Sequence, residues 1–182
     1  MNVISLERMR DRLHAKLEDR ARMAFIERDF QRALRDSRQA LRYGSRCFQA
    51  HALHGDVLCA LGREDDALAA YHQARRLAPG RAEPYWSVST VHSLAGRWEQ
   101  ALRYLDLAQA RLKRGDGPLY EWVAEDRAIA LAKIGRRQEA LDALRWGLRR
   151  RPRGVRLREL RAELTARAPP RSSGPASLKP VP

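Results

Sequence analysis

The stretch FQAHALHGDVLCALGREDDALAAYHQARRLAPGR spans residues 48–81 and contains two helical patterns separated by a turn. Gly55 lies in the first pattern, and Ala67 and Ala74 lie seven residues apart in the second. Small residues at matching heights let two antiparallel helices approach closely. Between the patterns, Gly62 supplies the left-handed backbone conformation that ends a helix, and Pro79 cannot continue the second one. The stretch therefore predicts a helix-turn-helix unit.

The same pattern occurs four times along the chain, and the steps between copies are 34, 34 and 39 residues. Apolar residues follow spacings of three and four without strand-like alternation, which predicts that every element is helical. The first copy has Arg28 where the other copies have the turn glycine. The longer last step predicts an inserted turn at 113–118. An Ala-Leu dipeptide marks each copy: Ala33-Leu34, Ala67-Leu68, Ala101-Leu102 and Ala140-Leu141.

This pattern resembles the tetratricopeptide repeat (TPR), a 34-residue helix-turn-helix unit with small, large and proline positions in the same order. The resemblance implies an all-α fold, namely a right-handed superhelical solenoid of about four TPR-like helix-turn-helix repeats with a C-terminal capping helix. Residues 1–13 are then an N-terminal helical extension, 155–168 the capping helix, and the proline- and serine-rich residues 169–182 a disordered tail. One ungapped register places the repeats at 14–47, 48–81, 82–115 and 121–154.

Composition indicates a soluble, helix-rich protein. Of the 182 residues, 44% are apolar and 32% are charged, and the formal net charge is +14. With only two cysteines, Cys47 and Cys59, no disulfide framework is expected, and reduced thiols fit a cytosolic setting. No apolar run is long enough for the core of a signal peptide or for a membrane span. We therefore expect the protein to be cytoplasmic.

Motifs for catalysis or for metal binding are not predicted. The sequence has no glycine-rich phosphate loop, nucleophile elbow or paired-carboxylate constellation, so we expect neither an enzyme, nor a cofactor, nor a small-molecule substrate. Cys47, His51 and His54 share one helical face, a spacing that suits metal ligation. However, Cys59 lies about 18 Å further along the helix, and the two histidines occupy packing positions of the repeat. We therefore expect no metal site.

In TPR proteins the first helix of each pair lines a concave groove that binds partner peptides, so the resemblance implies such a groove here. Six of the groove residues are acidic and one is basic, and two are tryptophans, the residue type most frequent in binding hot spots. We therefore expect a protein–protein interaction adaptor or scaffold that binds a basic and apolar peptide. The blander interpretation is that the acids balance neighbouring arginines and that the tryptophans pack between repeats. The groove residues expected from the register are Glu18, Asp19, Arg22, Gln49, Ala52, Leu53, Asp56, Glu83, Trp86, Ser87, Thr90, Trp122, Glu125, Asp126 and Ile129.

A basic segment near the C-terminal end is the alternative site. Clustered arginines could neutralise phosphates, so nucleic acid or an acidic membrane is the alternative partner, although no recognisable nucleic-acid-binding fold accompanies them. The segment could equally be a solvated face with cations near a helix C-terminus. A third hypothesis is a secretion-type chaperone for a client protein, because small chaperones of this family have a similar length. The basic patch comprises Arg145, Arg149, Arg150, Arg151, Arg153, Arg156, Arg158 and Arg161.

Overall fold

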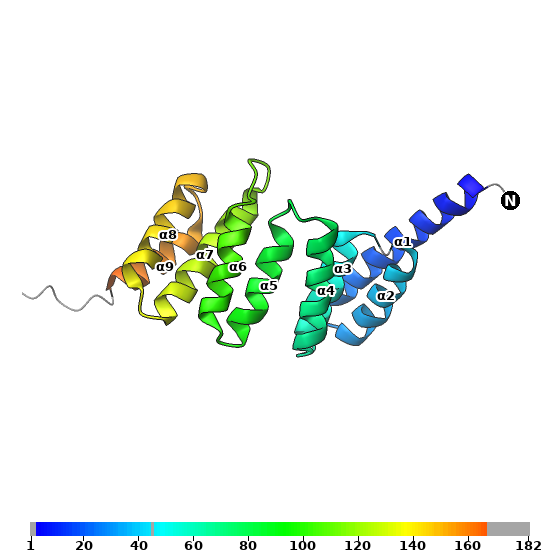
Figure 1. Cartoon of the computed structure of the whole chain (residues 1–182), viewed down its shortest axis with the longest axis horizontal. Coiled ribbons are helices and arrows are strands. Elements are labelled where there is room, and N and C mark those ends of the chain that lie inside the picture. The colour runs from blue at the N-terminus through cyan, green and yellow to red at the C-terminus, as the bar shows by residue number, and fades with distance from the viewer. Residues whose placement is uncertain (1–2, 45, 167–182) are drawn as a thin grey trace, which may run out of the picture.

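The computed structural model describes residues 3–44 and 46–166, which form nine α-helices and no strand. The helices follow one another in an elongated row, which is the all-α solenoid that the repeats predict (Figure 1). Within the described residues, no helix combines the length and the hydropathy that crossing a bilayer requires. The helices are α1 (Val3–Ile26), α2 (Phe30–Tyr43), α3 (Phe48–Ala60), α4 (Glu64–Leu77), α5 (Glu83–Leu94), α6 (Trp98–Gln109), α7 (Gly117–Lys133), α8 (Arg137–Arg150) and α9 (Val155–Ala166).

Consecutive helices pack as four pairs, α1 with α2, α3 with α4, α5 with α6 and α7 with α8. The first helix of each pair also contacts the first helix of the next, and α7 contacts α9. Among the described residues, no contact joins the second helix of one pair to the second helix of the next. The first helices are therefore crowded together while the second helices are spread apart, so the stack curves with α1, α3, α5 and α7 on its inside. We call the surface of these four helices the inner face.

The turn inside each pair depends on one residue with a left-handed backbone. Gly62, Gly96 and Gly135 have φ angles of 71°, 70° and 79°, as their turn positions predict. Arg28 occupies the same position in the first pair and has a φ of 62°. The turn is thus preserved without glycine, and Arg28 carries the conformational cost of a side chain in this region.

Small residues sit where helices meet. The alanines of the four Ala-Leu dipeptides are fully buried. At Gly55, a Cβ atom would lie 2.5 Å from the ring of Tyr71, and at Gly147 it would lie 2.5 Å from the Cβ of Ala124. These distances are shorter than van der Waals contact, so the backbone at both positions approaches its neighbour more closely than any side chain would allow.

The two ends of the described chain differ. At the C-terminal end, α9 covers the last pair and buries Leu157 and Leu160 completely or nearly so, which is worth about 1.5–3 kcal/mol for each leucine. At the N-terminal end, α1 includes residues 3–13 of the expected extension and projects beyond α2, with Ile4 and Met9 exposed (Figure 1). The expected disordered tail 169–182 lies outside the described residues.

The inserted residues before the fourth pair are shared between a turn and a helix. Following α6, a connection over 110–116 contains the turn in which the Asp116 carboxylate accepts a hydrogen bond from the Lys113 amide at 2.7 Å. Helix α7 then begins at Gly117, four residues before the start of the expected fourth repeat, with Pro118 in its first turn. Proline suits that position because its missing N–H would have no partner within the helix. The extra length therefore lengthens α7.

Candidate functional site

The two tryptophans expected on the inner face lie against each other. Trp86 of α5 and Trp122 of α7 stack with their ring centroids 5.1 Å apart and their planes 25° from parallel. Trp122 is 47% exposed, whereas Trp86 is half-buried and packs against the core of the last two pairs. Trp86 therefore packs in part between helix pairs, while the ring of Trp122 is open to solvent.

A carboxylate completes this cluster. The indole N–H of Trp86 donates a hydrogen bond to Oδ2 of Asp126 on α7 at 2.7 Å. Burial raises the pKa of Asp126 to about 6, against an ordinary value of 3.8, and the nearby Glu125 adds to the rise while the Trp86 hydrogen bond opposes it. We call Trp86, Trp122 and Asp126 the Trp–Asp cluster. It offers a partner an exposed aromatic face beside a carboxylate that a cation would stabilise in its ionised form.

A second inner-face acid is held in a similar way. Asp56 of α3 accepts a hydrogen bond from the hydroxyl of Tyr71 on α4 at 2.7 Å. Burial is the largest influence on this carboxyl and raises its pKa, while the Tyr71 hydrogen bond lowers it. The pKa of Tyr71 is raised by burial and by the Asp56 charge. Asp56 therefore belongs to the packing between α3 and α4 as much as to the inner face.

Two residues expected in the groove are buried instead. Leu53 is 6% exposed and Ser87 is 7% exposed, so neither presents a side chain to a partner. Both lie on inner helices, but on the side that packs against neighbouring helices. Thr90 is half-buried and donates its hydroxyl hydrogen to the carbonyl oxygen of Trp86 at 3.2 Å. Ile129 is also half-buried and packs against the core.

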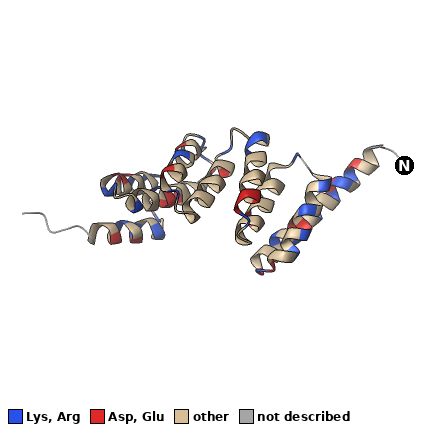
Figure 2. Ribbon diagram, turned by 60° about the horizontal axis from the view of Figure 1, so that its bottom comes forward, with Lys and Arg blue, Asp and Glu red and all other residues tan. Residues whose placement is uncertain are grey.

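Several of the remaining expected residues lie at the surface and are engaged locally. Arg22 pairs with Glu18 at 2.6 Å one helical turn away on α1, and Asp19 is exposed. Gln49 is exposed at the start of α3, next to half-buried Ala52 in the same helix. Glu83 accepts from Arg81 at 2.5 Å, immediately before α5. Charged residues of both signs are interspersed along α1, the helix at the N-terminal end in Figure 2.

The inner-face acids and the C-terminal basic patch are in contact. Arg156 of α9 donates to Glu125 of α7 at 2.8 Å, and Arg151 approaches Glu121 of α7 at 4.0 Å. The acids that have an arginine partner are thus partly neutralised. Neither Asp126 nor Asp56 makes an ion pair among the described residues, but only Asp126 lies beside an exposed aromatic ring, that of Trp122.

The basic patch is divided among different roles. Arg145 pairs with Asp142 on α8, and Arg158 donates to the carbonyl oxygen of Pro152. The guanidinium of Arg150 lies 5.7 Å from the ring of Tyr120 and 5.9 Å from that of Trp146. Within the part of the chain that the structure describes, Arg149, Arg153 and Arg161 are exposed and their guanidinium groups make no ion pair.

Cys47, His51 and His54 do not form one cluster. His54 hydrogen-bonds through Nδ1 with the hydroxyl of Ser37 on α2 at 2.9 Å, and burial lowers its pKa to about 4. His51 and His54 line a shallow hollow together with residues of α2 and α4. Cys47 instead lies close to His14 and Glu18 of α1. The sequence analysis did not identify His14. The signal that could have found it is the stacking of first helices, which places the start of the first repeat, where His14 lies, near the start of the second, where Cys47 lies.

Comparison with known proteins supports the same fold. No protein-family model matches the sequence, and no curated protein matches it at a significant level. TTC0263, a thermophilic TPR protein of Thermus thermophilus, has 22% identity and a TM-score of 0.70 over 80% of this chain and 78% of its own. PilF of Pseudomonas aeruginosa has 17% identity and a TM-score of 0.75 over 86% of this chain and 69% of its own.

A third similar structure is that of YrrB, a TPR protein with an unusual peptide-binding site. It has 19% identity and a TM-score of 0.58 over 80% of this chain and 73% of its own. The repeat pattern, the four helix pairs, the left-handed turns and these similarities agree with one another. The chain therefore has the fold of the tetratricopeptide-repeat proteins.

Proposed function

We propose that this chain is a protein-interaction adaptor that binds a basic and apolar segment of a partner protein on its inner face. The Trp–Asp cluster is the centre of the binding site, and a lysine or arginine of the partner pairs with Asp126. The observation that carries this proposal is the combination of an exposed Trp122 ring with a half-buried carboxylate that has a hydrogen-bond donor but, among the described residues, no cation.

A carboxylate removed from water lacks part of the solvation that stabilises its charge. A pKa raised by burial means that the ionised form of Asp126 is poorly solvated in the free protein. A cation in hydrogen-bond contact restores that solvation, and such charge-assisted bonds contribute about 1.5–3 kcal/mol. The same cation over the face of Trp122 gains about 0.5–2 kcal/mol from the aromatic ring. Apolar neighbours in the segment would cover the rest of the indole.

Two further facts favour a protein segment as the ligand. YrrB, which has the same fold, is a TPR protein with a peptide-binding site, and extended surfaces of stacked repeats suit extended ligands. The basic patch supports binding of nucleic acid or acidic membrane less well, because Arg145, Arg151 and Arg156 are already paired with carboxylates. An adaptor with an acidic and aromatic site is therefore the function that we favour.

Selection from a random peptide library tests this proposal. The full chain is immobilised, bound peptides are sequenced, and the affinity of one selected peptide is measured by fluorescence anisotropy. We expect peptides that contain a lysine or arginine beside apolar residues. Replacement of that basic residue with glutamine should weaken binding at least tenfold, which corresponds to about 1.4 kcal/mol.

Variants locate the site. Asp126→Asn keeps an oxygen for the Trp86 hydrogen bond but removes the charge, so it should erase the difference between the basic peptide and its glutamine version. Trp122→Ala should weaken both peptides. The matched control is Asp65→Asn, which removes an exposed carboxylate from the outer helix α4. Selection of acidic peptides, or equal affinities for Asp126→Asn and the unchanged chain, would show that the proposal is wrong.

A further inference from the structure

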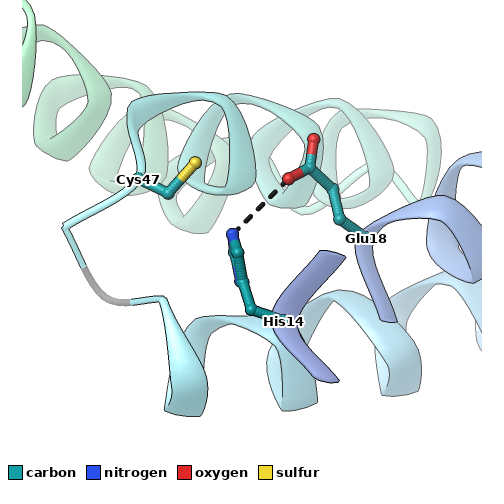
Figure 3. Close-up of side chains that lie close together, drawn as sticks. All are labelled: His14, Glu18 and Cys47. Carbon is teal, nitrogen blue, oxygen red and sulfur yellow. Dashed lines mark ion pairs between the residues drawn. The ribbon is translucent and has the colours of Figure 1, made fainter. Parts of the chain in front are cut away.

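A second cluster lies at the N-terminal end of the inner face and does not depend on the proposed function. His14 and Glu18 lie one turn apart on α1, and Cys47 lies directly before α3 (Figure 3). One side-chain atom of each residue, His14 nitrogen, Glu18 oxygen and Cys47 Sγ, lies within 4.8 Å of the other two. Nε2 of His14 and Oε2 of Glu18 are 3.6 Å apart. All three residues are half-buried, with the side chains of His14 and Glu18 15% and 16% exposed.

The ring of His14 is oriented by a backbone acceptor. Its Nδ1 lies 3.1 Å from the carbonyl oxygen of Ala40 on α2. A carbonyl oxygen can only accept, so Nδ1 carries the hydrogen, and Nε2 is the ring nitrogen that faces Glu18 and that would bind a metal ion through its lone pair. A histidine that ligates a metal usually donates its other N–H in this way, which fixes both the tautomer and the ring plane.

The other two side chains are also held by outer partners. Oε1 of Glu18 accepts from Arg22 at 2.6 Å, which leaves Oε2 for the side that faces His14. Sγ of Cys47 donates to the amide oxygen of Gln49 at 3.3 Å. Each candidate ligand is therefore oriented by a group outside the cluster. Metal ligands commonly have outer partners of this kind.

A glycine between α2 and α3 makes room for the histidine ring. A Cβ atom on Gly44 would lie 2.3 Å from Nδ1 and Cε1 of the His14 ring, so the ring packs directly on the glycine backbone. The connection that contains Gly44 joins α2 to α3 and brings Cys47 to the same place. The end of α2 and the glycine that follows it therefore hold the ring of His14 in place.

We propose that His14, Glu18 and Cys47 form a binding site for Zn²⁺, with a water molecule as the fourth ligand. Imidazole, thiolate and carboxylate are all ligands of zinc, at distances of about 2.0–2.3 Å. In a tetrahedral site such bonds place neighbouring ligand atoms about 3.5 Å apart, which His14 and Glu18 nearly match without movement. Rotation of the Cys47 side chain would bring its Sγ to the third ligand position of the same zinc ion.

Charge and protons balance at this site. Binding of Zn²⁺ displaces the thiol proton of Cys47 to solvent, since a zinc ligand must be the thiolate. The dication then faces one thiolate and one carboxylate, so the centre is neutral. The side-chain amide of Gln49 then rotates so that its NH₂ group, and not its oxygen, faces Cys47 and donates a hydrogen bond to the thiolate. Ca²⁺ and Mg²⁺ are not the metals expected here, because both ions prefer sites built from oxygen ligands alone.

Such a site would clip the first helix pair to the second. His14 and Glu18 belong to α1, while Cys47 belongs to the start of α3, and bound zinc would join them across the connection between α2 and α3. The first pair is the one whose turn is formed by Arg28 rather than by glycine, and zinc would add a link between this pair and the next. We infer that zinc stabilises the N-terminal end of the solenoid.

Titration of the reduced, metal-free full chain with Co²⁺ and then Zn²⁺ tests the site. Co²⁺ is the probe because its thiolate complexes absorb in the near ultraviolet. We expect one equivalent of Co²⁺ to produce this absorption, and one equivalent of Zn²⁺ to remove it. Zn²⁺ should also raise the melting temperature in circular dichroism.

Matched variants separate this site from adventitious binding. Cys47→Ser should abolish the thiolate–cobalt absorption, and His14→Gln and Glu18→Gln should each weaken Zn²⁺ binding at least tenfold. The control Cys59→Ser removes the other thiol, which lies on the far part of α3, and should leave the absorption and the zinc-dependent rise in melting temperature unchanged.

Three results would overturn the proposal. One is the absence of thiolate–cobalt absorption in the folded, reduced chain. Another is absorption that persists in Cys47→Ser or disappears in Cys59→Ser. The third is a zinc-dependent rise in melting temperature that is the same in Cys47→Ser as in the unchanged chain. Circular dichroism of each metal-free variant establishes that it is folded before the titration.

Discussion

Trp86 donates its indole hydrogen to the carboxylate of Asp126 at 2.7 Å, and this bond joins the third helix pair to the fourth across 40 positions of sequence. The bond is satisfied by either protonation state of the carboxyl group, because both retain an accepting oxygen. What changes with protonation is the cost of keeping a charge in a half-buried place. Asp126 therefore links the packing of two helix pairs to pH.

Replacing Asp126 with asparagine should stabilise the fold at neutral pH. Because the pKa of Asp126 is raised from 3.8 to about 6 in the folded chain, the folded state binds a proton that the unfolded state has lost between these values. The contribution of Asp126 to stability therefore falls as pH rises from about 4 to about 6, by at most about 3 kcal/mol. Urea unfolding of both proteins at pH 4 and pH 7 measures the difference. A variant that is less stable at pH 7 would contradict this account.

His54 should make the fold sensitive to acid. Burial lowers the pKa of His54 from 6.5 to about 4, so the folded state resists a proton that the unfolded state accepts. The contribution of His54 to stability is therefore full above pH 6.5 and is lost as pH falls towards 4. Between pH 7 and pH 4.5, the melting temperature of His54→Gln should fall by less than that of the unchanged chain. Since Asp126 acts in the opposite direction over this range, the comparison is cleanest in the Asp126→Asn background.

Arg28→Gly should stabilise the first helix pair. Arg28 has a φ of 62°, a region that costs an ordinary residue about 1–2 kcal/mol and glycine very little. Glycine also has a more flexible unfolded state, so we expect a net gain of about 0.5–1 kcal/mol in the free energy of unfolding. The reverse substitution, Gly62→Ala, should cost about 1 kcal/mol, because its surroundings are open and only the backbone conformation is strained. If both substitutions destabilise, the left-handed turn of Arg28 is not under strain.

Gly147→Ala should destabilise the C-terminal end. The added Cβ would lie 2.5 Å from that of Ala124 and 2.9 Å from Cδ1 of Leu157, so α7, α8 and α9 would have to separate. Overpacking of this kind costs about 1–3 kcal/mol. Gly80→Ala is the control, since a Cβ there meets no atom within 4 Å and the backbone is not left-handed. The denaturant midpoint of unfolding should be lower for Gly147→Ala than for Gly80→Ala.

The helix pairs were predictable because their signals are local. Gly62 ends a helix through its own backbone, and the buried alanines such as Ala67 recur at a fixed spacing, so neither requires knowledge of the rest of the chain. The position of Arg28 in the turn also followed from the spacing, although its left-handed conformation did not. The conformational propensity of arginine disfavours a left-handed turn position, and the packing of the first helix pair overrides this preference at Arg28.

The candidate site was only partly predictable. The register placed Trp86, Trp122 and Asp126 on inner helices, but Leu53 and Ser87 were also expected there and are buried. Successive residues of a helix point about 100° apart, so a register that identifies the right helix does not decide which residues point away from its neighbours. The bond between Trp86 and Asp126 depends on side-chain rotamers of two helices, which no spacing in the sequence encodes.

The tryptophans have a consequence for how unfolding of this chain is observed. Two groups of buried residues divide the core, one over α1 to α5 and the other over α5 to α9, and both include residues of α5. All four tryptophans of the chain lie in α5, α6, α7 or α8, so indole fluorescence reports the C-terminal half alone. Circular dichroism, by contrast, averages over every helix. The separation between the two melting curves is therefore a direct gauge of cooperativity through α5, and coincident curves would mean that this one helix makes the two halves unfold as a single unit.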